Sequence, residues 1–185
     1  MKIKFLVTAI GLFFLSCSPP LHYYRQDGEE FTRVKKVAVM PFRNITSRRE
    51  AGKIITNLFV HELVINGAYQ VEEMGNIWEF FIRQRIRKKG EVDLITIKML
   101  GSQLGVDAVI FGVVEEYYQE EGRRGEISPQ VGLSIRMVEV TNGKILWKCR
   151  HQRSGDEYII VLDLGKVSTV TQLAQKVIRE MLATL

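Results

Sequence analysis

An apolar run in the middle of the chain constrains the fold more than any other feature. Residues 106–114 read Val-Asp-Ala-Val-Ile-Phe-Gly-Val-Val, so a single charge interrupts an otherwise apolar stretch. A short run that is apolar on both faces is typical of a strand that lies inside a sheet and is covered on both sides. The sequence therefore predicts a sheet built around this segment.

Shorter strand patterns accompany this run. The further predicted strands are residues 37–42, 69–72, 131–140 and 144–152. Asn142-Gly143 is a strong signal for a two-residue hairpin turn between the last two. In the final strand, Ile145, Trp147 and Cys149 are expected to share one face. Residues 119–129 are charged and rich in glycine, and they are predicted to form a loop.

Helical spacing of apolar residues occurs in four segments. The predicted helices are residues 48–65, 76–89, 95–104 and 167–182. Thr46 or Ser47 is expected to cap the first helix, with Glu50 completing a capping box, and Gly67 is expected to end it. Strands and helices in this mixed order predict an α/β fold with a central mixed sheet covered by helices.

The first residues of the chain differ from the rest. Lys2 and Lys4 precede an apolar run from Phe5 to Leu15, which is followed by Ser16-Cys17. This layout is typical of a signal peptide, and the run is too short to span a bilayer as a stable helix. A small residue before a cysteine indicates a lipoprotein signal, in which the thiol is diacylated and the chain is cut in front of it. A plain signal peptide with a chance cysteine and a retained anchor are the competing interpretations.

The leader divides the chain into three parts. Residues 1–16 are predicted to be the signal peptide, 17–33 a flexible tether that begins at the acylated Cys17, and 34–185 the folded domain. Loss of the leader removes two of the 26 basic residues and leaves 24 against 21 acidic ones, a net charge of +3. That balance is too mild to imply nucleic acid. Cys149 becomes the only thiol, which is expected to be buried.

Three segments together resemble a known family of envelope proteins. They are residues 37–42 (Val-Ala-Val-Met-Pro-Phe), residues 104–115 around the central strand, and residues 138–147 around the Asn142-Gly143 turn. In this order behind a lipoprotein signal, they resemble the curli production assembly/transport lipoproteins, the CsgG family. Peptidoglycan-synthase activator lipoproteins and the amino-terminal domain of TolB share that fold. The resemblance covers about residues 34–185 and implies an anticodon-binding-like, periplasmic, often oligomeric domain without catalytic residues.

The chain departs from the pore-forming members of that family. Two membrane hairpins need four strands of about 9–11 alternating residues each. Only 16 residues lie between Val114 and Val131, and seven of them are charged. The sequence therefore favours a domain that does not form a pore itself.

Catalytic motifs are weak. His61-Glu62 lacks the second histidine of a zinc-protease helix, and the chain has no Gly-x-Ser-x-Gly and no Cys-x-x-Cys. Asp107 could be taken for a catalytic acid, but capping of the strand start is the simpler role for it. The sequence predicts a protein that is not an enzyme and needs no metal or cofactor.

These observations predict a non-enzymatic periplasmic lipoprotein of the outer membrane that acts as a binding or scaffold subunit in assembly or export. A curli-type secretion channel component and an activator of a peptidoglycan synthase are the alternatives. Expected partners are the membrane, envelope proteins and other copies of the chain. Exposure and charge suggest partner contacts at Arg83, Arg85, Arg87, Lys88, Arg123 and Arg124, although basic residues near a helix end are more often simply solvated.

Overall fold

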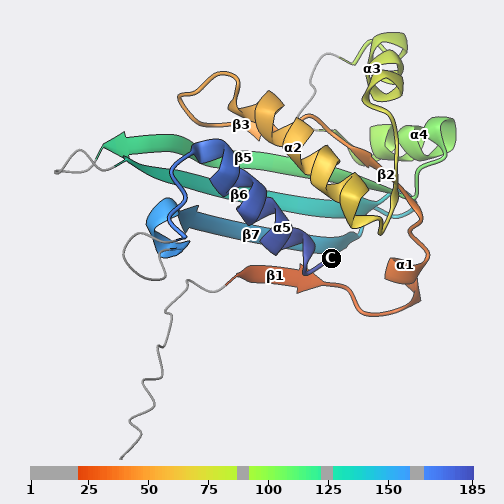
Figure 1. The fold of residues 1–185 in the computed structure, drawn as a ribbon. Coiled ribbons are helices and arrows are strands. Elements are labelled where there is room, and N and C mark those ends of the chain that lie inside the picture. The colour runs from red at the N-terminus through yellow and green to blue at the C-terminus, as the bar shows by residue number, and fades with distance from the viewer. Residues whose placement is uncertain (1–20, 87–91, 122–126, 159–164) are drawn as a thin grey trace, which may run out of the picture.

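The computed structural model describes residues 21–86, 92–121, 127–158 and 165–185. Its centre is a seven-stranded sheet with the order β1–β7–β6–β5–β2–β4, and β3 lies beside β5 (Figure 1). The strands are β1 His22–Arg25, β2 Lys36–Val39, β3 Arg43–Asn44, β4 Gln70–Val71, β5 Ala108–Glu121, β6 Ile127–Glu139 and β7 Ile145–Ser154. The helices are α1 Glu29–Thr32, α2 Ala51–Asn66, α3 Met74–Arg83, α4 Leu94–Leu104, α5 Val170–Leu182 and the 3-10 turn η1 Gly155–Tyr158.

The predicted central strand is β5. It pairs in parallel with β2 and β3 and antiparallel with β6, so the sheet is mixed. Side chains of β5 are buried on both faces of the sheet, which explains why the inner half of the strand is apolar throughout. The predicted α/β fold, with a central mixed sheet covered by helices, is confirmed.

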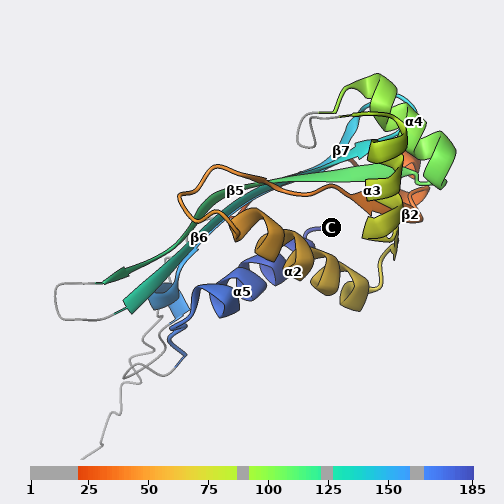
Figure 2. The ribbon, with the colours of Figure 1, turned by 90° about the horizontal axis from the view of Figure 1, so that it is seen from above.

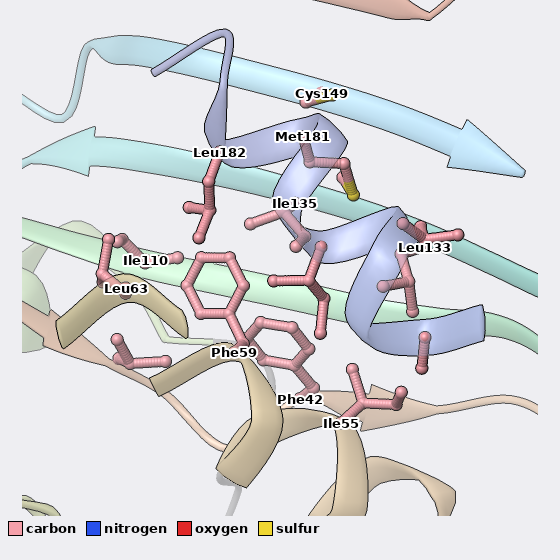
Figure 3. Packing of buried hydrophobic residues seen from close by; sticks show 14 of the residues in the cluster. Phe42, Ile55, Phe59, Leu63, Ile110, Leu133, Ile135, Cys149, Met181 and Leu182 are labelled. Atoms are coloured by element: carbon pink, nitrogen blue, oxygen red, sulfur yellow. The ribbon is translucent and has the colours of Figure 1, made fainter. Parts of the chain in front are cut away.

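Helices cover the two faces of the sheet unequally. Figure 2 shows α2 and α5 lying along one face, where they enclose the larger core with the sheet. Phe42, Phe59 and Ile135 meet at the middle of this core (Figure 3). On the other face, α3 and α4 cover only the end near β2 and form a smaller core there with residues such as Met40 and Phe81. No helix among the described residues is long and apolar enough to cross a membrane.

A close contact at Gly112 locks the loop after β2 onto the sheet. The Phe42 ring lies where a side chain at Gly112 would begin, and its centroid is 5.2 Å from that of Phe59. We expect Gly112→Ala to lower the free energy of unfolding by about 1–3 kcal/mol, because the added methyl group overpacks the core. Denaturant titration measures this. The decrease in the free energy of unfolding caused by Gly112→Ala should be smaller in a Phe42→Leu background than in the wild type. Equal decreases in the two backgrounds would contradict the contact.

The folded domain begins earlier than predicted. β1 pairs antiparallel with β7, with Tyr23 opposite Cys149, and the side chain of Phe31 in α1 is buried. Residues 21–33 of the predicted tether therefore belong to the domain. Their sequence gave no strand signal because all four β1 side chains are exposed, and the strand is held by backbone pairing at the sheet edge.

The predicted loop at residues 119–129 is largely strand. β5 continues to Glu121 and β6 begins at Ile127, and the pairing holds as far as Glu121↔Ile127. Cross-strand backbone hydrogen bonds extend the hairpin through residues that have poor strand propensity. Figure 2 shows the outer parts of β5 and β6 running past α2 and α5.

Helix ends agree with the sequence in part. Gly67 and Gly105 take the left-handed conformation that ends α2 and α4, with φ of 72° and 64°. The capping box expected at Ser47 and Glu50 does not form, because α2 starts at Ala51 and no side chain caps it. Instead the Asn44 side chain donates hydrogen bonds to the carbonyls of Arg48 and Arg49.

The β6–β7 connection also differs from the prediction. Five residues, 140–144, separate the strands, and Gly143 has a φ of 78°. A register shift at Met137/Val138 makes Leu146 as well as Trp147 face the larger core, whereas Ile145 is 41% exposed. The bulge thus breaks the simple alternation that the sequence suggested.

Candidate binding surfaces

One face of the sheet carries no helix of the described chain on the side of β1. We call it the open face. The strand register identifies the side chains on this face, because residues directly opposite each other on paired strands point to the same side. Two rows cross it, and they consist of Tyr24, Lys148, Arg136 and Phe111, and of His22, Arg150, Ser134, Val113 and Arg43.

A basic hollow lies in the open face. Its volume is about 190 Å³, and its cations come from three strands: Arg43 from β3, Arg136 from β6 and Lys148 from β7. The guanidinium carbon of Arg136 lies 5.2 Å from the centre of the Phe111 ring, which holds that side chain over the sheet. None of the residues that line the hollow is acidic.

Two of these cations face each other directly. Arg136 and Lys148 occupy opposite positions in the β6–β7 register, a placement that is destabilising for like charges. Neither they nor Arg43 form an ion pair with any described residue. By contrast, Arg150 on the same face is paired with Glu115, with 2.8 Å between Nε and Oε2. The hollow therefore gathers three cations that have no ion-pair partner among the described residues.

The sequence-predicted partner contacts fall elsewhere or outside the described residues. Arg83 ends α3 and forms an exposed ion pair with Glu79, and Arg85 follows it with a φ of 54°. Arg87, Lys88, Arg123 and Arg124 lie outside the described part of the chain, as does Cys17. No sequence pattern marks the basic hollow, because its residues are far apart in the chain and meet only through the strand register.

Arg83 and Arg85 belong to a second surface. We call this surface, formed by the last turn of α3 and the residues after it, the α3 end. Ile82 is 75% exposed there, next to Arg83. Two hollows of about 320 Å³ each flank the helix. One is lined by residues of α3 and α4, including Arg83 and Gln103, and the other by residues of α2, α3 and the Phe42 loop, including Trp78.

The most elaborate polar cluster lies between β7, η1 and α5. Glu180 accepts hydrogen bonds from His151 Nε2 at 2.5 Å, Arg153 Nε at 3.1 Å and the Tyr158 hydroxyl at 2.7 Å. Burial alone would raise the pKa of Glu180, but these three hydrogen bonds outweigh it and lower the pKa to about 2. Burial also raises the pKa of Tyr158, so its hydroxyl stays protonated and donates. The groups satisfy one another, as in a structural network.

Other reactive side chains have structural partners as well. Asp107 Oδ2 accepts hydrogen bonds from the backbone nitrogens of Lys35 and Lys36 at 2.8 and 2.9 Å, which confirms that it caps a strand start. His61 is exposed on α2. Within the described ranges, no three His, Cys, Asp or Glu side chains are grouped so that they could hold a metal ion.

Cys149 is buried, as the sequence predicted, with 1% of its surface exposed. Burial raises the pKa of its thiol from 9.0 to about 11, which keeps it protonated at neutral pH. We expect iodoacetamide to label the native thiol at least 100-fold more slowly than the unfolded one at pH 7.4, because a two-unit shift alone lowers the thiolate fraction about 100-fold. Mass spectrometry of quenched time points measures both rates, and similar rates would show that the site is open.

Sequence comparison gives no family. No protein-family model matches the chain, and no curated protein matches it.

Solved structures do share the fold. The PelC dodecamer from Paraburkholderia phytofirmans superposes with a TM-score of 0.61 at 18% identity, over 89% of this chain and 94% of that one. Lipoprotein GNA1162 from Neisseria meningitidis gives 0.57 at 18% identity, over 82% and 99%. The LpoB C-terminal domain from Escherichia coli gives 0.50 at 14% identity, over 69% and 87%. The described domain therefore has the same fold as PelC, lipoprotein GNA1162 and the LpoB C-terminal domain.

Proposed function

We propose that the chain is a lipid-anchored, non-catalytic binding subunit of the bacterial envelope, held by Cys17 at the periplasmic face of the outer membrane. The leader pattern that ends at Cys17 supports the anchor. The likeness in fold to lipoprotein GNA1162 is in keeping with it. The saturated hydrogen bonds around Glu180 and the buried Cys149 favour binding over catalysis.

One geometric observation carries this proposal. Cys17 precedes the edge strand β1 by only five positions, whereas α3 packs against β2, which lies four strands from β1 in the sheet. At about 4.8 Å per strand, four spacings separate β1 from β2 by about 19 Å. The anchored edge and the α3 end therefore lie on different sides of the domain (Figure 1), so that a partner can reach α3 while the lipid stays in the membrane.

The α3 end has the chemistry of a partner contact. An exposed Ile82 lies between the basic Arg83 and the aromatic Trp78, and hollows lie on both sides of the helix. Apolar side chains rimmed by charge are typical of interaction sites. Arg83 and Arg85 are thus proposed to contact a partner, as the sequence suggested.

Site-specific photo-crosslinking in cells tests this proposal. A photoreactive residue in place of Ile82 should give one discrete heavier product, which mass spectrometry identifies as an envelope protein. The matched control replaces Ile65 on α2, which is 63% exposed and should give none. Equal products from both positions, or none from either, would contradict a specific contact at α3.

Two narrower functions are alternatives, and the identity of the protein crosslinked to position 82 distinguishes them. A second copy of the chain in the product favours a ring-forming, curli-type assembly, an idea to which the shared fold with the PelC dodecamer lends support. A peptidoglycan synthase in the product favours activation of cell-wall synthesis. The shared fold with the LpoB C-terminal domain is in keeping with that alternative.

A further inference from the structure

The short connection between Cys17 and β1 limits how far the domain can stand from the membrane. Five residues span at most about 18 Å when fully extended, and β1 begins at His22. If the proposed lipid is on Cys17, the β1 edge lies within that distance of the phospholipid headgroups. This step rests on the proposed function.

The residues brought to that distance suit a membrane surface. β1 presents His22, Tyr23, Tyr24 and Arg25, and all four are exposed. Tyrosine favours the membrane–water interface, where one end of its side chain is apolar and the other polar. The register places Tyr24 beside Lys148 on the open face, so the basic hollow begins one strand in from the edge.

The hollow itself has the size and charge of a phosphate site. At about 190 Å³ it is larger than the ~150 Å³ cavity that admits benzene in an unrelated protein, so a phosphate group fits. Arg43, Arg136 and Lys148 supply hydrogen-bond donors and no residue of the lining supplies a carboxylate. An anion between Arg136 and Lys148 would relieve the repulsion of this directly opposed pair.

We propose that the basic hollow binds the phosphate of an anionic phospholipid in the membrane to which Cys17 anchors the chain. Each basic side chain at an anionic surface strengthens binding about fivefold. The anchor adds to this by holding the hollow at a high local concentration of headgroups. The lipid contact would keep the β1 edge and the adjoining part of the open face at the bilayer.

Native mass spectrometry of the full protein, purified from membranes in detergent, tests this proposal. The probes are short-chain phosphatidylglycerol, short-chain phosphatidylcholine and inorganic phosphate. Arg136→Gln combined with Lys148→Gln should weaken phosphatidylglycerol binding about 25-fold. Arg150→Gln is the matched control, since it removes a cation that Glu115 already neutralises, and it should bind like the wild type. The double variant should fold like the wild type, because the like-charge repulsion that it removes offsets the lost cation–π contact between Arg136 and Phe111.

The outcomes separate this proposal from the anchor. Equal binding of phosphatidylglycerol and phosphatidylcholine, or equal loss in the control and the double variant, would overturn the lipid site. Inorganic phosphate binding as well as phosphatidylglycerol would overturn its assignment to lipid. The same spectra report the mass of the chain, so an unmodified Cys17 would overturn the proposed anchor independently of any lipid adduct.

Discussion

Glu180→Ala is expected to lower the free energy of unfolding by about 2–4 kcal/mol at pH 7. The carboxylate is the common acceptor for His151, Arg153 and Tyr158, and the first two side chains are 2% and 11% exposed. Removal of one member of a buried charged network leaves its partners desolvated and unpaired, which costs more than the network contributes while it is intact. Arg153 keeps its bond to Glu157, so the loss should not exceed this range.

The same residue makes stability depend on pH in acid. The pKa of Glu180 falls from 4.5 to about 2 on folding, so its contribution is fully present above about pH 4.5 and is lost as the pH falls toward 2. Because the side chain is about a third exposed, solvent screens the interaction, and we expect this contribution to be about 1–2 kcal/mol.

Urea titrations from pH 6 to pH 2.5 test this dependence. Glu180→Gln should lose less stability than the wild type over that range, because it has no carboxylate to protonate. Glu79→Gln is the control, since its ion pair with Arg83 is exposed and contributes little. A Glu180→Gln variant that parallels the wild type at every pH would show that the carboxylate is not held ionised by folding.

Cys17→Ser is expected to abolish the incorporation of labelled palmitate and to leave residues 1–16 attached. In a lipoprotein, acylation of the cysteine comes before the cut. Two acyl chains also account for stable membrane attachment, since each buried CH₂ contributes about 0.8 kcal/mol and a single chain holds only marginally.

Cys149→Ser is the matched control for this labelling, because Cys149 is the only other cysteine in the chain. It should keep the full palmitate signal and the short form of the chain, since the thiol lies inside the larger core. A signal that persists in Cys17→Ser, or that disappears in Cys149→Ser, would contradict acylation at Cys17.

The elements that could be predicted from sequence are those whose side chains report their surroundings. The inner half of β5 is apolar on both faces because both faces are covered, and α5 is apolar on one stripe because only that stripe meets the sheet. Gly67 and Gly105 mark helix ends because few other residues adopt a positive φ at low cost.

The elements that were missed depend on backbone pairing or on register. β1 and the outer part of the β5–β6 hairpin contain polar side chains that look like loops, and their strands form because a neighbouring strand offers hydrogen-bond partners. The basic hollow was invisible because Arg43 and Arg136 are far apart in the chain. Only the register of β3, β5 and β6 shows that they share one face.

The intact mass of the protein purified from bacterial membranes tests the lipid anchor at Cys17. We expect a chain that begins at Cys17, with the mass of residues 17–185 plus its acyl groups. A chain of the full 185 residues with a free thiol at Cys17 would contradict the lipid anchor and, with it, the placement of the open face at the bilayer.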